Sequence, residues 1–450
     1  MGTKNGLQKT LSPFMLWGLG VGYVISGMYF GWNLGLEKGG TLGMALATIV
    51  IMVMYLTFTF SYTELTCAIP KAGGAFDYAN KALGTNVGFI AGIAQIVEFT
   101  FAPPAIAFAI GAYFNAIYPQ IPILANAFVI YLVFTALNIY GIKAAASFET
   151  IITILAVGEL LLFTGITAPR FQTDNLLHNA FPNGASGAFA AIPFAIWFFL
   201  GIEGVANVAE ETQNPQRDIV KGFGWAIFTL VVLCVLVFVS SIGVAGWETI
   251  VFKNGSSSET SDSPLPLALA KITGNNHPMF HLLIAIGLFG LIASFHGLIL
   301  AAGRSTYEMG RVRNLPPFLG AISERFHTPA NALLGNMIIG MLALLSGKTG
   351  EIIIISVFGA LTLYIISMIS LIVLRKKQPE LNRPFKVPFY PFFPLMALII
   401  ALVSLVAMFI FNLKLGTVYF SILAFAFLLF KIFKTRNTLA YDKTANTGIR

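Results

Sequence analysis

The chain is a succession of apolar stretches, each about 20 residues long and each closed by polar or basic residues. A helix of about that length crosses the hydrocarbon core of a bilayer, whereas one soluble core does not need so many such stretches. Charged residues make up 10% of the 450 residues, far below the roughly 25% of a soluble domain. We therefore expect an all-α, multi-pass membrane protein that forms a single domain over residues 1–450.

Twelve stretches have the length and hydropathy of membrane-spanning helices. Their expected ranges are 13–36, 41–66, 86–115, 124–141, 146–168, 188–211, 222–246, 279–303, 329–346, 351–374, 390–411 and 414–433. With the amino terminus on the cytoplasmic side, most of the 27 lysine and arginine residues fall inside. We therefore expect both termini to be cytoplasmic, and the net charge of +8 to reflect topology instead of a nucleic-acid partner.

The sixth apolar stretch carries a carboxylate, Glu203, between Gly201 and Gly204. Ionisable groups inside a span are rare and usually face a cavity, a partner or a transport pathway. Helix-breaking residues near the middle of a span free backbone groups that can hold a substrate. We therefore expect a broken helix with Glu203 at a binding site, although a structural salt bridge or a protonated carboxyl would also explain this residue.

The first stretch is rich in glycine, with Ser26 and Gly27 close to its middle. Glycine in a helix indicates either close packing or an unwound segment. The first and sixth spans are thus both expected to be interrupted, with four ordinary spans between them. This spacing is typical of two five-helix repeats of inverted topology. The repeats would cover about 13–168 and 188–374, with accessory helices at about 390–433.

Four sequence motifs resemble those of the amino acid, polyamine and organocation (APC) transporter superfamily. They are ELTCAIPKAGGAFDYANKALG at 64–84, AEETQNPQRD at 209–218, GRSTYEMGR at 303–311, and NLPP at 314–317 followed by Thr328 and Pro329. The resemblance implies a LeuT-like fold of about twelve helices, with helices 1 and 6 discontinuous and the substrate held at their unwound parts. It also implies alternating access, a lipid bilayer as surroundings and no enzymatic reaction.

A narrower resemblance is to the bacterial ethanolamine permeases. It is carried by VISGMYFGW at 24–32, VEFTFAPPAI at 97–106, IPFAIWFFLGIEG at 192–204, ASFHG at 293–297 and NRPFKVPFYP at 382–391. This resemblance implies import of ethanolamine, a small organic cation, across the bacterial cytoplasmic membrane. An amino-acid permease or exchanger of the same superfamily is the alternative. No cofactor is expected, and H⁺ or Na⁺ is the possible coupling ion.

An ammonium group that leaves water needs acceptors or an aromatic face. The expected acceptors are Glu203 and the backbone carbonyls freed by unwinding near Ile25, Ser26, Gly27 and Gly201, and Trp197 is the expected aromatic face. We expect Tyr29, Trp197 and Phe199 to act as gates, and for Trp197 the resemblance to relatives implies this role.

Among the other titratable groups inside spans, three are candidates for a functional role. Glu98 either lines the same route or pairs with a basic group such as Lys143 or Arg304. By resemblance, proton-coupled relatives carry a lysine at the position that corresponds to Ala156. Because that lysine is absent here, either Glu159 or Glu203 takes the proton, or the coupling ion is sodium, or the protein exchanges or only equilibrates its substrate. His296 is a core residue, a sensor of pH or a hydrogen-bonding partner of the substrate hydroxyl.

The residue before Ser26 indicates a substrate without a carboxylate. By resemblance, superfamily members that transport amino acids carry a Gly-Ser-Gly run at the first unwound site. Exposed backbone amides there bind the carboxylate of the substrate. Here Ile25 replaces the first glycine and narrows that pocket.

Two other classes of protein fit the sequence poorly. A membrane-embedded enzyme is disfavoured because no H-E-x-x-H or G-x-S-x-G motif is present. A channel is disfavoured because the sequence contains no filter-like motif.

Cys67 and Cys234 lie in separate apolar stretches and are expected to be packing residues. The sequence leaves the oligomeric state open.

Overall fold

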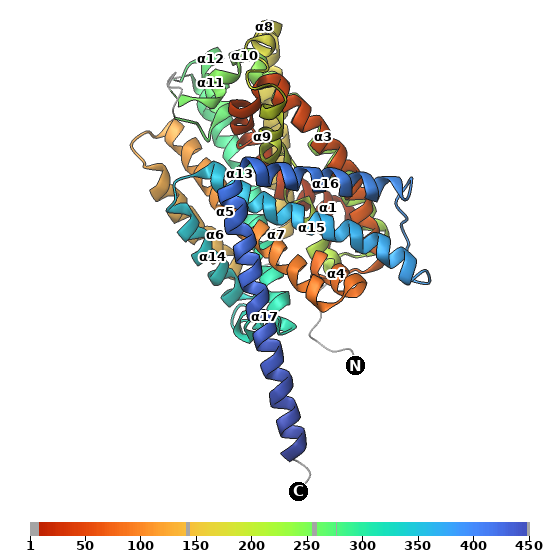
Figure 1. The fold of residues 1–450 in the computed structure, drawn as a ribbon. Coiled ribbons are helices and arrows are strands. Elements are labelled where there is room, and N and C mark those ends of the chain that lie inside the picture. Colours follow the sequence, from red (N-terminus) through yellow and green to blue (C-terminus); the bar gives the residue numbers. More distant parts are fainter. Residues whose placement is uncertain (1–8, 141–144, 254–258, 276, 448–450) are drawn as a thin grey trace.

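The computed structural model describes residues 9–140, 145–253, 259–275 and 277–447. Across these ranges the protein is a bundle of helices (Figure 1), and the β-structure there consists of two isolated bridges, Leu11 with Thr212 and Phe252 with Thr260. An all-α fold is what the apolar stretches predict, because a helix satisfies all its backbone hydrogen bonds internally.

In the described ranges, ten helical segments are long and apolar enough to cross a membrane. They are α3 (Asn33–Ala68), α5 (Thr85–Ile117), α6 (Ile123–Tyr140), α7 (Ala145–Thr167), α9 (Gly184–Trp197) continued by the 3₁₀ helix η2 (Ile202–Glu211), α10 (Pro215–Ala245), α13 (Pro278–Arg311), α15 (Thr349–Lys377), α16 (Phe392–Phe411) and α17 (Leu413–Thr447). Two shorter apolar helices, α1 (Pro13–Val24) and α14 (Ala330–Leu344), occupy the two remaining expected spans. The expected series of twelve apolar segments is therefore confirmed.

Short helices connect the long ones. They are α2 (Ser26–Tyr29), α4 (Ala75–Leu83), η1 (Ala168–Arg170), α8 (Thr173–Leu177), α11 (Trp247–Val251), α12 (Pro264–Thr273) and η4 (Pro317–Gly320).

The first and second expected spans meet inside α3, at Gly40. This glycine has φ +64° and ψ −172°, so the helix is broken there between 33–39 and 41–68. A Cβ at Gly40 would lie 2.4 Å from Cδ of Pro182 and 2.6 Å from the carbonyl oxygen of Ala180. Only glycine combines this backbone conformation with so close a neighbour. The break falls in the gap expected between residues 36 and 41.

Three helices are clearly longer than their apolar stretches predict. α10 begins at Pro215 instead of 222, α13 continues to Arg311 instead of ending near 303, and α17 continues to Thr447 instead of ending near 433. Pro215 suits the first turn of a helix because its missing N–H is not needed there. Hydropathy marks the apolar part of a span, whereas the helix itself continues with polar residues beyond it.

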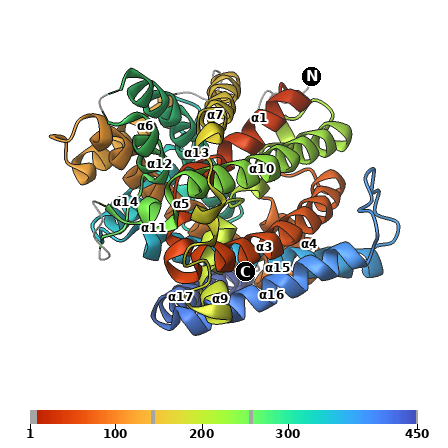
Figure 2. The same ribbon diagram turned by 90° about the horizontal axis from the view of Figure 1, so that it is seen from above.

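The helices differ in how deeply they lie in the bundle. Buried residues make up 89% of the apolar window of α5, which packs against α13 and α15, but only 22% of that of α6 and 17% of that of α17. In Figure 1, α17 (dark blue) extends beyond the other helices, and in Figure 2 α1 and α10 run side by side. The enclosed centre therefore lies around α5, where the carboxylate Glu98 is located.

Candidate functional site

The first membrane span is interrupted near its middle, as the sequence predicts. α1 ends at Val24, Ile25 separates it from the single turn α2, and Phe30 is extended with φ −162°. Gly31 has φ +88°, and α3 resumes the helical path at Asn33. The break therefore extends further toward α3 than Ser26 and Gly27 alone would suggest.

A side chain from another helix spans the first part of this break. The hydroxyl of Ser294, on α13, donates to the carbonyl oxygen of Gly22 (2.6 Å) and accepts from the backbone N–H of Ser26 (2.9 Å). Gly22 and Ser26 are four residues apart, which is the spacing of an α-helical hydrogen bond. Insertion of a hydroxyl into this ladder is a known cause of helix interruption. It also means that the amide of Ser26 already has a partner.

The sixth span is interrupted at the expected residues. α9 ends at Trp197, Gly201 is left-handed with φ +98°, and η2 begins at Ile202. A 3₁₀ segment in the middle of a span often marks a functional hinge.

The two interruptions lie against each other. A Cβ added to Gly27 would lie 2.4 Å from the carbonyl oxygen of Trp197 and 3.0 Å from Cα of Phe198. A Cβ on Gly204 would lie 2.7 Å from the ring of Tyr23, on α1. The unwound backbone segments of spans one and six are therefore in direct contact, and glycine makes that contact possible.

Two carboxyl groups meet at this contact. Glu203 on η2 is 1% exposed and Glu98 on α5 is 0% exposed, and the two groups lie within hydrogen-bonding range of each other. In the described part of the chain neither forms an ion pair with a basic side chain. A buried carboxylate without a counter-charge is costly by several kcal/mol. This centre is therefore suited to a positively charged group.

A chain of tyrosines supports Glu203 from one side. The hydroxyl of Tyr364, on α15, donates to Oε2 of Glu203 at 2.9 Å, and the hydroxyl of Tyr55, on α3, lies 3.0 Å from that of Tyr364. Tyr55 also reaches the carbonyl oxygen of Ile196 at 3.4 Å, just before the break in span six. Hydrogen bonds to the ionised form stabilise it. These tyrosines orient Glu203.

Aromatic rings cover the contact between the two breaks. Trp197 packs edge-to-face on Phe30 with centroids 5.4 Å apart, and its ring atoms lie over Gly31. Phe199 packs on Tyr55 with centroids 5.2 Å apart. Trp197 is 2% exposed and the two carboxyl groups are also buried, so both are enclosed in this structure.

Tyr29, an expected gate, is bound to the expected coupling residue. Its hydroxyl donates to Oε2 of Glu159 at 2.7 Å and lies 3.1 Å from the carbonyl oxygen of Ala156. Ala156 is the position at which proton-coupled relatives are expected to carry a lysine. The hydrogen bond to Tyr29 thus connects Glu159 to the first break through α2, at a place separate from the contact between Glu98 and Glu203.

His296 lies beside a buried acid on another helix. Its Nδ1 is 3.2 Å from Oε2 of Glu149, on α7, and both side chains are buried. The rings of Phe134 and Phe148 pack around it. The structure therefore does not bring His296 to the carboxyl pair. Glu149 reaches α1 directly, since a Cβ on Gly22 would lie 2.8 Å from its Oε1.

The carboxyl-terminal end of η2 is held by an ion pair. Arg304 Nη2 lies 2.7 Å from Oε1 of Glu211, with both side chains little exposed. Arg304 is therefore not the partner of Glu98, and Lys143, the other suggested partner, lies outside the described residues. A second polar cluster joins Gln95, Asn207 and Ser305 through three hydrogen bonds.

The opposite end of the first break is anchored by a loop. Asn33 accepts from the N–H of Gly31 (3.0 Å) and donates to the carbonyl oxygen of Ser261 (2.8 Å). The next residue, Asp262, accepts from the hydroxyl of Thr349 at 2.9 Å. Burial raises the pKa of Asp262 to about 6. This loop connects the starts of α3 and α15.

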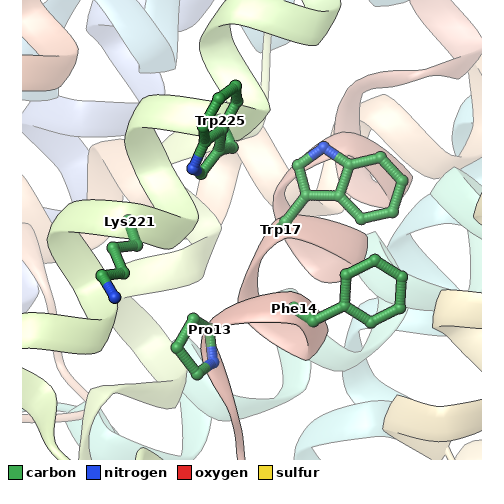
Figure 3. A pocket seen from close by; sticks show the side chains of 5 residues that line it. All are labelled: Pro13, Phe14, Trp17, Lys221 and Trp225. Carbon is green, nitrogen blue, oxygen red and sulfur yellow. The ribbon is translucent and has the colours of Figure 1, made fainter.

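A cavity of about 390 Å³ lies between α1 and α10 on the outer surface (Figure 3). Its walls are Pro13, Phe14, Trp17, Lys221 and Trp225. Phe14 and Trp225 are 57% and 63% exposed, so the cavity is open to the surroundings of the protein. Lys221 would repel an ammonium group and none of the five residues is acidic, so this cavity is not the candidate site.

Sequence reasoning missed Ser294, Tyr364, Tyr55 and Glu149. Each is a polar residue within an apolar stretch, which is the signal that drew attention to Glu203. Serine and tyrosine give a weaker signal than a carboxylate because they are common in membrane helices and pack without a counter-charge.

The fold and site together define a multi-pass membrane transporter with two discontinuous helices. The protein belongs to the amino acid permease family, whose model matches residues 11–433. The chain is similar to a branched-chain amino acid permease of Bacillus subtilis, with 27% identity over 86% of the chain and 85% of the relative. It is also similar to a low-affinity putrescine importer of Escherichia coli (25%, covering 83% of each) and to an uncharacterized transporter of Rhizobium meliloti (27%, covering 85% and 83%).

Proposed function

We propose that this protein imports ethanolamine, or a similar small organic amine, by alternating access across the cytoplasmic membrane of a bacterium. Ion coupling, both termini on the cytoplasmic side, the absence of an enzymatic reaction, and two repeats over about 13–168 and 188–374 are parts of the same proposal.

The observation that supports an amine most strongly is the buried pair Glu98 and Glu203. Two acids without a basic partner in the described ranges create a demand for positive charge at the contact between the broken helices. An ammonium group meets that demand, and Trp197 lies beside the break, where its face can add about 0.5–2 kcal/mol of cation–π attraction. The putrescine importer among the relatives is named for a cationic amine.

A second observation favours a substrate without a carboxylate. An unwound helix can bind a carboxylate through free backbone N–H groups. The N–H of Ser26 is already bonded to Ser294, and Ile25 is fully buried beside it. A carboxylate would also meet the negative charge of the acid pair.

The alternative is an amino-acid permease or exchanger. The branched-chain amino acid permease among the relatives supports it, and so does the family as a whole. L-serine separates the two functions well, because it is ethanolamine with one added carboxylate.

The test is uptake of radiolabelled ethanolamine into proteoliposomes that contain the full chain. We expect saturable uptake that is abolished by an excess of unlabelled ethanolamine. L-serine should be an at least tenfold weaker inhibitor than unlabelled ethanolamine. Imposed H⁺ and Na⁺ gradients then identify the coupling ion. Equal inhibition by L-serine would favour the amino-acid permease, and uptake no greater than in protein-free liposomes would refute the proposal.

A further inference from the structure

We propose that Glu98 and Glu203 have fixed and different roles: Glu98 keeps a proton and donates it to Glu203 in a hydrogen bond, and Glu203 alone carries the negative charge that binds the amine. This inference rests on the proposed function for the identity of the amine. It predicts a site matched to a single positive charge.

The first step is the contact between the two groups. An ionised carboxylate only accepts hydrogen bonds, so two ionised carboxylates have nothing to offer each other. As ionised groups, both oxygens of Glu98 and Oε1 of Glu203 would be buried without a donor from the described residues. One shared proton turns this repulsion into a carboxyl–carboxylate hydrogen bond.

The second step is the difference between their surroundings. Tyr364 donates to Glu203, and the backbone N–H groups of Gly201 and Glu203 lie near the same carboxyl. Among the described residues, Glu98 has no donor other than a proton of its own. Donors favour an ionised group, so the charge resides on Glu203 and the proton on Glu98.

The third step is the count of other charges that face the pair. The titratable groups around it are tyrosines from three elements: Tyr55 and Tyr62 on α3, Tyr364 on α15 and Tyr419 on α17. Tyrosine is neutral at physiological pH. The pair therefore carries one negative charge, which one ammonium group neutralises, whereas a diamine would leave a positive charge buried.

The role of Glu98 is tested by three substitutions. Glutamine mimics a protonated glutamate, since its amide donates a hydrogen bond and carries no charge. We expect Glu98→Gln to bind ethanolamine within about threefold of the wild type, and Glu98→Leu to bind at least tenfold more weakly because Glu203 loses its donor. Glu203→Gln should abolish binding. Isothermal titration calorimetry on the purified full chain measures all three.

The charge count is tested with 1,4-diaminobutane. At pH 6.5 the wild type should bind it at least tenfold more weakly than ethanolamine, because the site carries one negative charge. Glu98→Gln should show the same preference, because its amide also leaves a single negative charge, on Glu203. A Glu248→Gln variant, a carboxyl-to-amide change on α11, is the matched control and should behave as the wild type does.

Infrared spectroscopy tests the proton without any ligand. The carboxylic acid C=O band should be weaker in Glu98→Gln than in the wild type and unchanged in Glu248→Gln. An unchanged band in Glu98→Gln, or a loss of affinity in that variant as large as in Glu203→Gln, would overturn this inference. If the wild type binds no amine but the band behaves as expected, the proposed function fails and the assignment of the proton stands.

Discussion

The hydroxyl of Ser294 accepts a hydrogen bond from the backbone N–H of Ser26, 268 residues away in the sequence, at 2.9 Å. The same hydroxyl donates to Gly22, so α13 completes the hydrogen bonding of the broken span. One side chain thereby supports the break and occupies the amide that a substrate carboxylate would need.

Replacement of Ser294 by alanine tests both consequences. The variant leaves the N–H of Ser26 and the carbonyl of Gly22 without their partner, which should cost about 1–3 kcal/mol of stability. Inhibition of ethanolamine uptake by L-serine should become stronger, because the amide is free. Thermal unfolding in detergent and competition in proteoliposomes measure the two effects.

Ser370→Ala is the matched control for this variant. The Ser370 hydroxyl bonds to the carbonyl of Ile366 within its own helix, so its removal should change stability and inhibition little. A Ser294→Ala protein as stable and as selective as Ser370→Ala would contradict the role given to Ser294.

The contact between the two breaks is tested at Gly27. A Cβ there would lie 2.4 Å from the backbone oxygen of Trp197, which cannot move without displacing span six. Gly27→Ala should therefore lower stability by about 1–3 kcal/mol and reduce uptake strongly. Unfolding temperature and initial uptake rate are the measurements.

Gly224→Ala provides the comparison. Gly224 lies in α10, and no atom of the described residues beyond its own helix backbone lies within 4 Å of the place a Cβ would take. Alanine there should therefore be neutral or stabilising by up to about 1 kcal/mol. Similar behaviour of the two variants would show that the breaks do not depend on close approach at Gly27.

The loop that anchors the first break should respond to pH. Burial raises the pKa of Asp262 to about 6, above its ordinary value of about 3.9, so the folded loop favours the protonated carboxyl. Its contribution to stability is complete below pH 4 and is lost as the pH rises through 6. The loop should thus be more stable at pH 5 than at pH 7.5, although the hydrogen bond donated by Thr349 by itself favours the ionised carboxylate.

Hydrogen exchange of the Ser261 amide, which bonds to the carbonyl of Val251, reports on this loop. After correction for intrinsic rates, protection should be about three- to tenfold greater at pH 5, since partial exposure to solvent screens the effect. Asp262→Asn should remove the pH dependence. A variant that retains it would assign the titration to another group.

Much of this fold follows from the sequence because hydrocarbon imposes one simple requirement. Segments of sufficient apolar length must form helices, and the expected series of twelve agrees with the observed one. Helix ends are harder to predict, as at Pro215 and Arg311, because polar residues continue a helix outside the bilayer without a hydropathy signal.

The site is predictable where a residue is costly by itself. A carboxylate between glycines is expensive in a span, and Glu203 does lie next to a left-handed Gly201. The relationships between helices are not predictable, because Glu98, Tyr364 and Ser294 come from three separate elements and no local pattern sets their register. The same holds for His296, which has its acid partner on α7.

The central claim is that the carboxylate at the second break holds the amine. Ethanolamine binding to purified Glu203→Gln, compared with the wild type by isothermal titration calorimetry, tests it most directly. We predict a loss of at least 100-fold, equivalent to about 2.7 kcal/mol, in a variant whose unfolding temperature shows that it is folded. Affinity within threefold of the wild type in that folded variant would contradict the account.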